Sequence, residues 1–237
     1  MKVSKQTEMM FSQAVALSQG GRMKSTIHAK GKELFILNMD NTILLRFDSP
    51  DNFPEKVSFF ANDYESDTFE TVDGKIVFTS RAGNLERTKA CPVPEASWDA
   101  VNDIFNKHGE KVSKDFGITF SKGVLSLLDD GLSHVEFHNP SKIHLVQKDI
   151  YTGSVVTVTK NQDGFDFSSG SEFTGKLPIG MRTADFKALF SFAEEITFYF
   201  QPEGQFVYFE DNGGVFRGFL ATCLYDELPY IFDGGAQ

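Results

Sequence analysis

The sequence holds few of the residues that build covalent crosslinks or metal sites. Its 237 residues include 2 cysteines, 8 prolines and 1 tryptophan. Cys91 and Cys223 are too few for a disulfide framework or a cysteine-rich zinc site, so nothing indicates an oxidising compartment. No stretch reaches the roughly 20 apolar residues of a membrane span, and the opening MKVSKQTEMMF lacks the apolar segment of a secretory signal peptide. We therefore expect a cytoplasmic protein.

Specific signatures of the common enzyme classes are also missing. The chain has no GxxxxGK[ST] phosphate loop, no GxSxG elbow and no HExxH helix. His134, Glu136 and His138 alternate along HVEFH and would offer ligands to a metal. Val135 and Phe137 take the core-facing positions of that strand, however, which favours a solvated face for the other three. We expect no catalytic site, no metal and no cofactor.

What the sequence does contain indicates a packed core. Hydrophobic residues make up 41% and charged residues 24% of the chain, which includes 25 phenylalanines. This composition is typical of folded proteins and not of disordered or low-complexity chains. The formal net charge of −10 disfavours nucleic-acid binding by the surface as a whole. The charge is uneven, however, because residues 1–35 carry six basic and two acidic side chains.

The chain contains an internal duplication. Residues 101–137 can be laid on residues 11–47 without a gap, at an offset of 90. The overlay pairs Asp40 with Asp130 and keeps the apolar positions of the two segments in phase. Identity is low, but the shared pattern predicts two related structural units.

A second overlay defines the ends of the two units. VDGKIVFTSRAGNLER (72–87) aligns with PEGQFVYFEDNGGVFR (202–217) at an offset of 130, so both units are expected to end in the same hairpin. Between them, the two prolines of ACPVPEA suit an extended connector. We expect an N-terminal domain over 1–92 and a C-terminal domain over 93–237. The second domain carries an insert near 142–176 and a tail that includes LYDELPYIFDGGAQ.

Apolar periodicity and capping residues predict the secondary structure. The helices are expected over 4–18, 54–62, 97–108 and 183–193. Ser4, Ser97 and Thr183 are the expected N-caps of three of them. Strands are expected at STIHA, LFILNM, TILLRF, FGITF, VLSLL and HVEFH. The pattern indicates an α+β fold with more strand than helix.

Basic residues recur on or beside the expected helices. The helices themselves carry Lys5, Lys56, Lys107 and Lys187. Their flanks add Arg22, Lys24, Lys111, Lys114 and Arg182. Exposed lysines commonly keep a helix face soluble, which explains them without any partner. The other interpretation is that helices from both units form one basic surface suited to the backbone of duplex DNA.

Three segments resemble one protein family. They are the opening MKVSKQT with the GG and MKS that follow its helix, SFFANDYESDTFETVDGKIVF, and FKALFSFAEEITFYFQPEGQFVYFEDNGGVFRGFLATC. The sequence thereby resembles the DNA polymerase sliding clamps (processivity factors), and most of all the trimeric clamps of T-even-type bacteriophages. The resemblance implies a duplicated α+β DNA-clamp fold, in which each of two similar domains has antiparallel sheets outside and two helices on the inner face. It also implies a ring of three subunits that encircles duplex DNA and tethers the replicative polymerase without catalysis.

The resemblance assigns roles to particular residues. The basic residues named above would face the DNA without reading its sequence. Edge strands would join neighbouring subunits, with the strands near Val77 and Val207 as candidates. The polymerase and the clamp loader would insert short peptides into an apolar groove. The expected groove residues are Val93, Pro94, Leu224, Pro229 and Tyr230.

A different class of function stays open at this point. A non-catalytic, β-rich phage structural or host-interaction protein without DNA binding would have the same composition and duplication. The placement of the helical lysines distinguishes the two, because a clamp needs them on one surface.

Overall fold

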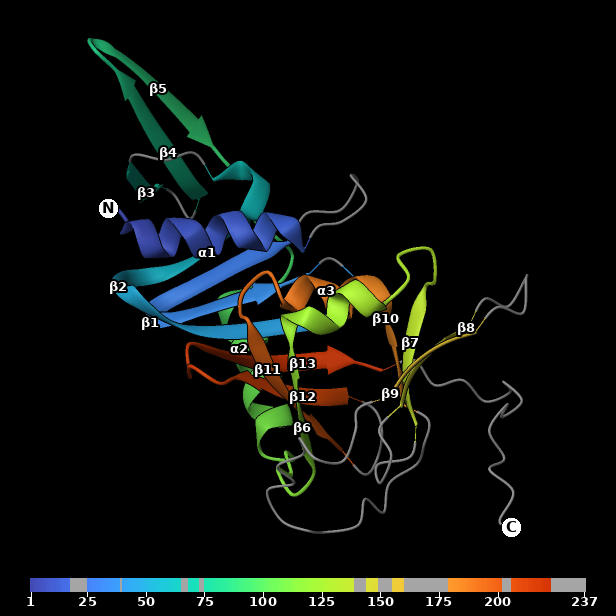
Figure 1. The fold of residues 1–237 in the computed structure, drawn as a ribbon. Coiled ribbons are helices and arrows are strands. Elements are labelled where there is room, and N and C mark those ends of the chain that lie inside the picture. The colour runs from blue at the N-terminus through green and yellow to red at the C-terminus, as the bar shows by residue number, and fades with distance from the viewer. Residues whose placement is uncertain are drawn as a thin grey trace, which may run out of the picture.

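A computed structural model of the chain shows three helices and three antiparallel sheets in its described part (Figure 1). The structure describes residues 1–17, 25–38, 40–64, 68–72, 75–138, 144–148, 155–159, 179–201 and 206–222. The α-helices are α1 (Lys5–Ala16), α2 (Trp98–Gly109) and α3 (Thr183–Leu189), with 3-10 turns η1 (Ala61–Asp63) and η2 (Lys122–Leu127). The strands are β1 (Thr26–Leu37), β2 (Ile43–Phe60), β3 (Thr68–Val72), β4 (Lys75–Ala82), β5 (Leu85–Ala90), β6 (Gly117–Ser121), β7 (His134–His138), β8 (His144–Lys148), β9 (Val155–Thr159), β10 (Ile179–Arg182), β11 (Glu195–Phe200), β12 (Phe206–Asp211) and β13 (Phe216–Ala221).

The largest sheet joins the two halves of the chain. This sheet A has the strand order β1-β2-β13-β12-β11-β6. Its seam lies between β2 and β13, where Phe47 is opposite Phe216 and Leu45 is opposite Gly218. Sheet B has the order β3-β4-β5, and sheet C has the order β10-β7-β8-β9.

The elements repeat as the sequence overlays predicted. Both α1 and α2 begin at a serine cap: Ser4 accepts a hydrogen bond from the N–H of Thr7, and Ser97 from that of Ala100. The overlay at offset 130 places β4 on β12 and β5 on β13. Each of these hairpins turns at a glycine with positive φ, Gly83 or Gly214. The prediction that both halves end in the same hairpin is confirmed.

Two of the predicted elements are wrong. Residues 54–62, predicted as a helix, belong mainly to the long strand β2, in which Val57 pairs with Ala29 and Phe59 with Ile27 of β1. The segment forms a strand because its backbone hydrogen-bonds to β1. The burial follows the strand period of two, since Val57 and Phe59 are buried while Lys56, the residue before Val57, is exposed. The segment VLSLL, predicted as a strand, lies largely within η2. The helices over 5–16, 98–109 and 183–189 are confirmed within the predicted ranges to a few residues.

The core has two parts, one on each face of sheet A. Neighbouring residues of a strand point to opposite faces. Leu34 and Ile36 pack in the larger cluster, with α1, α3 and residues of sheets B and C. Phe35, between them, packs in a smaller cluster with Trp98 and Phe105 of α2. We call these sides the α1–α3 face and the α2 face, and Figure 1 shows α2 across the sheet from the other two helices.

The strand HVEFH is more buried than its alternation predicts. Val135 and Phe137 are buried, as expected, but Glu136 is only 3% exposed and is therefore not part of a solvated face. The strand β7 lies between β10 and β8, where Glu136 is opposite Gly180 and the buried Val146. No group of three His, Cys, Asp or Glu among the described residues is arranged to hold a metal.

A buried histidine makes the stability of the fold depend on pH. His28 lies between the hydroxyls of Thr26, 2.8 Å from Nε2, and Ser58, 2.9 Å from Nδ1. Burial lowers its pKa from 6.5 to about 4. Because the unfolded chain binds this proton more readily, stability is complete above pH 6.5 and falls as the pH drops towards 4.

We expect this one histidine to cost about 3 kcal/mol of stability between neutral pH and pH 4. Urea unfolding at several pH values measures the slope of the free energy of unfolding against pH. In His28→Gln the slope over this range becomes much flatter, whatever the variant's stability at neutral pH. Equal slopes in the two proteins would show that other groups dominate acid unfolding.

Candidate nucleic-acid interface

The exposed side of α1 mixes polar and apolar residues, Met9 and Val15 among the latter, and carries no exposed carboxylate. Lys5, Gln6, Met9 and Ser12 are exposed, whereas Met10, Phe11 and Ala14 are buried against the sheets. The one acidic residue of the helix, Glu8, is half-buried and accepts a hydrogen bond from the hydroxyl of Tyr64 at 3.2 Å. The exposed surface of α1 therefore presents one positive charge at Lys5, for which the described residues provide no ion-pair partner.

Two further candidate cations lie beside α3, and both are held by carboxylates. The guanidinium of Arg182 donates to Asp185 at 2.8 and 3.0 Å, to Asp40 at 2.6 Å and to the hydroxyl of Thr42 at 3.2 Å. Hydrogen bonding to Asp185, followed by Asp40, raises the pKa of Arg182. The ammonium of Lys187 donates to Asp130.

These ion pairs line a hollow on the α1–α3 face. Its volume is about 600 Å³, and its walls come from Leu17 after α1, the turn at Asp40, the segment from Asp130 to Ser133, and α3. Charged residues in its lining are Arg182, Lys187, Asp40, Asp130 and Asp185, which give a formal charge of −1.

The other described candidate cations lie on the opposite side of sheet A. Lys56 contacts Asp99 of α2 at 2.7 Å, and Lys114 contacts Glu210 at 2.6 Å. Lys107 and Lys111 are exposed, within α2 and just after it. The predicted surface with one lysine from each of four helices is therefore wrong. Lys56 is on a strand, and the lysines of α2 cannot share a surface with Lys5. The placement of these lysines does not favour a clamp over the alternative class of function. The arrangement of helices and sheets has to decide between the two. Arg22 and Lys24 lie outside the described residues.

On the α2 face, the exposed residues of α2 carry slightly more negative than positive charge. Exposed residues of α2 and the two positions after it include Lys107 and Lys111, but also Asp99, Asp103 and Glu110. Burial alone would raise the pKa of Glu210, but hydrogen bonds from Lys114 and Tyr208 lower it instead, so this carboxylate is held charged.

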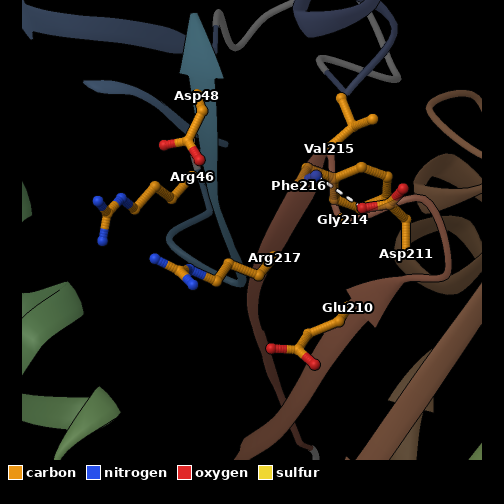
Figure 2. A pocket seen from close by; sticks show the side chains of 8 residues that line it. All are labelled: Arg46, Asp48, Glu210, Asp211, Gly214, Val215, Phe216 and Arg217. Atoms are coloured by element: carbon orange, nitrogen blue, oxygen red, sulfur yellow. Dashed lines mark hydrogen bonds between the residues drawn. The ribbon is translucent and has the colours of Figure 1, made fainter. Parts of the chain in front are cut away.

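A pocket on this face has the same balance. Figure 2 shows Arg46 of β2 and Arg217 of β13 side by side, near Asp48, Glu210 and Asp211. Two guanidinium groups and three carboxylates give a formal charge of −1 in a volume of about 160 Å³. The carboxylate of Asp211 also accepts the N–H of Phe216 at 2.7 Å and that of Gly213 at 3.0 Å, which braces the β12–β13 turn. The pocket therefore does not favour phosphate.

The expected peptide groove is described only in part. Val93 is 53% exposed, but Pro94 is buried, in the connector that leads into α2. Leu224, Pro229 and Tyr230 lie outside the described residues. The apolar side chains of sheet A nearest the connector, such as Phe35 and Phe219, are covered by α2. Sequence periodicity predicts that α2 has a buried stripe, but it does not say which face of which sheet the helix covers.

The open sheet edges differ from those expected. Val77 is on β4 and Val207 on β12, and both are interior strands, so the prediction that these strands join subunits is wrong. At the edges of sheet B, β3 is already covered by Met1, which exchanges two backbone hydrogen bonds with Phe69. In the described part of the chain β5 is therefore the open edge of sheet B.

The arrangement of helices and sheets can be compared with known proteins. No protein-family model matches the sequence, and no curated protein is similar to it. Among solved structures, the DNA polymerase III subunit beta of Borrelia burgdorferi matches 93% of this chain, with a TM-score of 0.63 and 12% identity. The C. crescentus beta sliding clamp matches 94% of the chain, with a TM-score of 0.63 and 10% identity. The chain has the sliding-clamp fold.

The matched clamps differ in chain length, and this chain covers a different share of each. This chain spans 63% of the Borrelia subunit and 65% of the C. crescentus clamp. In the PCNA2–PCNA3 complex of Sulfolobus tokodaii it spans 95% of the matched chain, over 91% of its own length, with a TM-score of 0.56 and 14% identity. The predicted duplicated α+β clamp fold is confirmed. No helix in the described part of the chain has the length and apolar content to cross a membrane.

Proposed function

We propose that this protein is a DNA sliding clamp, a ring that encircles duplex DNA and tethers the replicative polymerase. The observation that carries the proposal is the match of more than nine-tenths of the chain to sliding-clamp structures. A ring retains DNA by topology, so it needs neither a sequence-reading surface nor strong phosphate contacts. This agrees with an acidic chain in which several of the candidate cations, Lys56, Lys114, Arg182 and Lys187, are paired with carboxylates. In this role the protein is a tether and not a catalyst.

The ring we propose has three subunits, each with domains 1–92 and 93–237. The match to 95% of the PCNA chain supports a subunit of similar length, and the equivalence of the β4–β5 and β12–β13 hairpins supports two domains within it. The opening MKVSKQT supports a clamp of the T-even phage type, which would act in the cytoplasm of an infected bacterium. Light scattering after size exclusion tests the assembly. We expect a species of three times 26.5 kDa, and a monomer at every concentration would contradict it.

We propose that the α1–α3 face lines the hole. Lys5→Glu then places a negative charge towards DNA in every subunit, and we expect binding to a short labelled duplex at low salt to weaken by about tenfold. Lys107→Glu makes the same change in charge on the opposite side of sheet A and is expected to have less than about a twofold effect. Equal losses in the two variants, or a larger loss in Lys107→Glu, would contradict this orientation.

We propose that the polymerase and the clamp loader bind through short peptides near the connector. The exposed Val93 and the C-terminal residues Leu224, Pro229 and Tyr230 remain the proposed contacts. Because α2 covers the apolar part of sheet A there, the peptide would bind beside that helix and not beneath it.

A further inference from the structure

The two paired cations of the hollow share a feature that comes from the duplication. Arg182 is held by Asp40, in the turn between β1 and β2, and Lys187 by Asp130, in the segment before β7. The gap-free overlay of the two halves places Asp40 and Asp130 at equivalent positions. At this position, each of the two units therefore carries a carboxylate that pairs with a cation. Asp40 pairs with Arg182 at the start of α3, and Asp130 pairs with Lys187 in its last turn.

The exposure of these groups shows that the carboxylates lie on the outside. Asp130 is 90% exposed in its side chain, whereas Lys187 is 17% exposed. Asp130 has no other hydrogen bond among the described contacts; Gly131 bonds instead to the neighbouring Asp129. A residue so exposed contributes little to folding. Its effect is to cover the ammonium of Lys187 with negative charge on the surface proposed to face DNA.

We infer that Asp130 acts as a built-in competitor of DNA phosphate, which occupies Lys187 and keeps the hold of the α1–α3 face on the duplex weak. Asp40 has this effect on Arg182 only in part, because Arg182 is also held by Asp185. The inference rests on the proposed function. A phosphate oxygen accepts the same hydrogen bonds from a lysine or arginine as a carboxylate does, so the two compete directly. With Asp40 and Asp130 neutral, the hollow would change from a formal charge of −1 to +1. The competition keeps the clamp mobile on DNA.

The test measures binding of the full chain to a short, fluorescently labelled linear duplex over a series of salt concentrations. The variants are Asp130→Asn, Lys187→Gln and the double variant, with Asp103→Asn as the matched control. Asp103 is an exposed carboxylate on α2, so its removal changes the net charge equally on the other side of sheet A. Thermal unfolding of each variant confirms that the fold is kept.

We expect Asp130→Asn to bind the duplex about three- to tenfold more tightly at low salt, with a salt dependence steeper by about 0.9 for each freed lysine that meets a phosphate. Asp103→Asn should bind as the parent does. The double variant should lose the gain and bind like Lys187→Gln. Unchanged binding by Asp130→Asn would overturn the inference, and so would a gain that persists without Lys187, because it would reflect general repulsion only.

The duplex-binding test of the competition and the end-blocked test of the ring can fail separately. A gain that requires Lys187, together with failure to remain on end-blocked DNA, would support the competition and contradict the clamp. Retention on end-blocked DNA without the gain would support the clamp and overturn the competition.

Discussion

Gly218→Ala is expected to destabilise the protein by about 3 kcal/mol, the upper end of the usual cost of overpacking. Gly218 lies on β13 at the seam of sheet A, opposite Leu45 of β2. A Cβ at this position would lie 2.2 Å from the carbonyl oxygen of Leu44 and 2.9 Å from the ring of Phe209. The first contact is with backbone and cannot be relieved by a rotamer change, so β13 must move away from β2.

Urea unfolding measures this loss, and Gly117→Ala is the matched control. A Cβ on Gly117 would also be too close to another atom, at 2.7 Å, but that atom belongs to the side chain of Tyr199 on the neighbouring strand. The tyrosine ring can rotate away, so we expect a cost of about 1 kcal/mol. If both variants lost the same amount, the close approach of the two halves at the seam would not be a determinant of stability.

We propose that β5, the open edge of sheet B, joins neighbouring subunits, and we therefore expect Thr88→Pro to weaken ring assembly while leaving each subunit folded. Just after β5, the N–H of Cys91 donates to the carbonyl of Ile76 in β4. The odd-numbered residues of β5 therefore also point their backbone N–H and C=O groups towards β4. Hydrogen bonding alternates along an antiparallel pair, so the N–H of Thr88 points to the open edge of sheet B. Proline removes that donor without breaking the β4–β5 ladder.

The expected loss is about 3 kcal/mol per contact, or on the order of a hundredfold in subunit affinity. Light scattering over a concentration series measures it, and Thr88→Ala, which keeps the N–H, should assemble normally. Circular dichroism should be unchanged in both. A Thr88→Pro protein that still formed the full assembly would exclude β5 as the strand that joins subunits.

Local sequence signals predicted much of the fold. Ser4 and Ser97 cap helices because the side-chain oxygen of an extended residue accepts a hydrogen bond from a free N–H of the first turn. The predicted cap Thr183 is wrong, because Arg182 is the N-cap of α3 and Thr183 is already helical. The equivalence of the β4–β5 and β12–β13 hairpins was also visible, since the overlay places Gly83 on Gly213; in the structure, Gly83 and the adjacent Gly214 have positive φ. The helix predicted at 54–62 was wrong because the apolar residues of this segment fit both the helical and the strand period. Pairing with β1 makes the segment a strand.

The candidate site was less predictable for the same reason. Lysines on helices are visible in a sequence, but their common orientation depends on which face of a sheet each helix covers. The pairing of Lys187 with Asp130 joins residues far apart in the chain, and only the overlay of Asp40 on Asp130 indicated that these positions are related. For the strand edges the sequence did hold a signal, because the edge strand β5 (LERTKA) is mostly charged or polar, whereas the strands of Val77 and Val207 are rich in apolar residues and are interior.

Retention on end-blocked DNA tests the central claim most directly. The protein is allowed to thread onto linear duplex fixed at one end, the free end is then blocked with a bulky protein, and the complex is washed at high salt. The account predicts that the clamp stays on the blocked DNA, because salt removes phosphate contacts but not a topological link, and that a single restriction cut releases it. Loss in high salt despite both blocks, or retention after the cut, would contradict a ring around DNA.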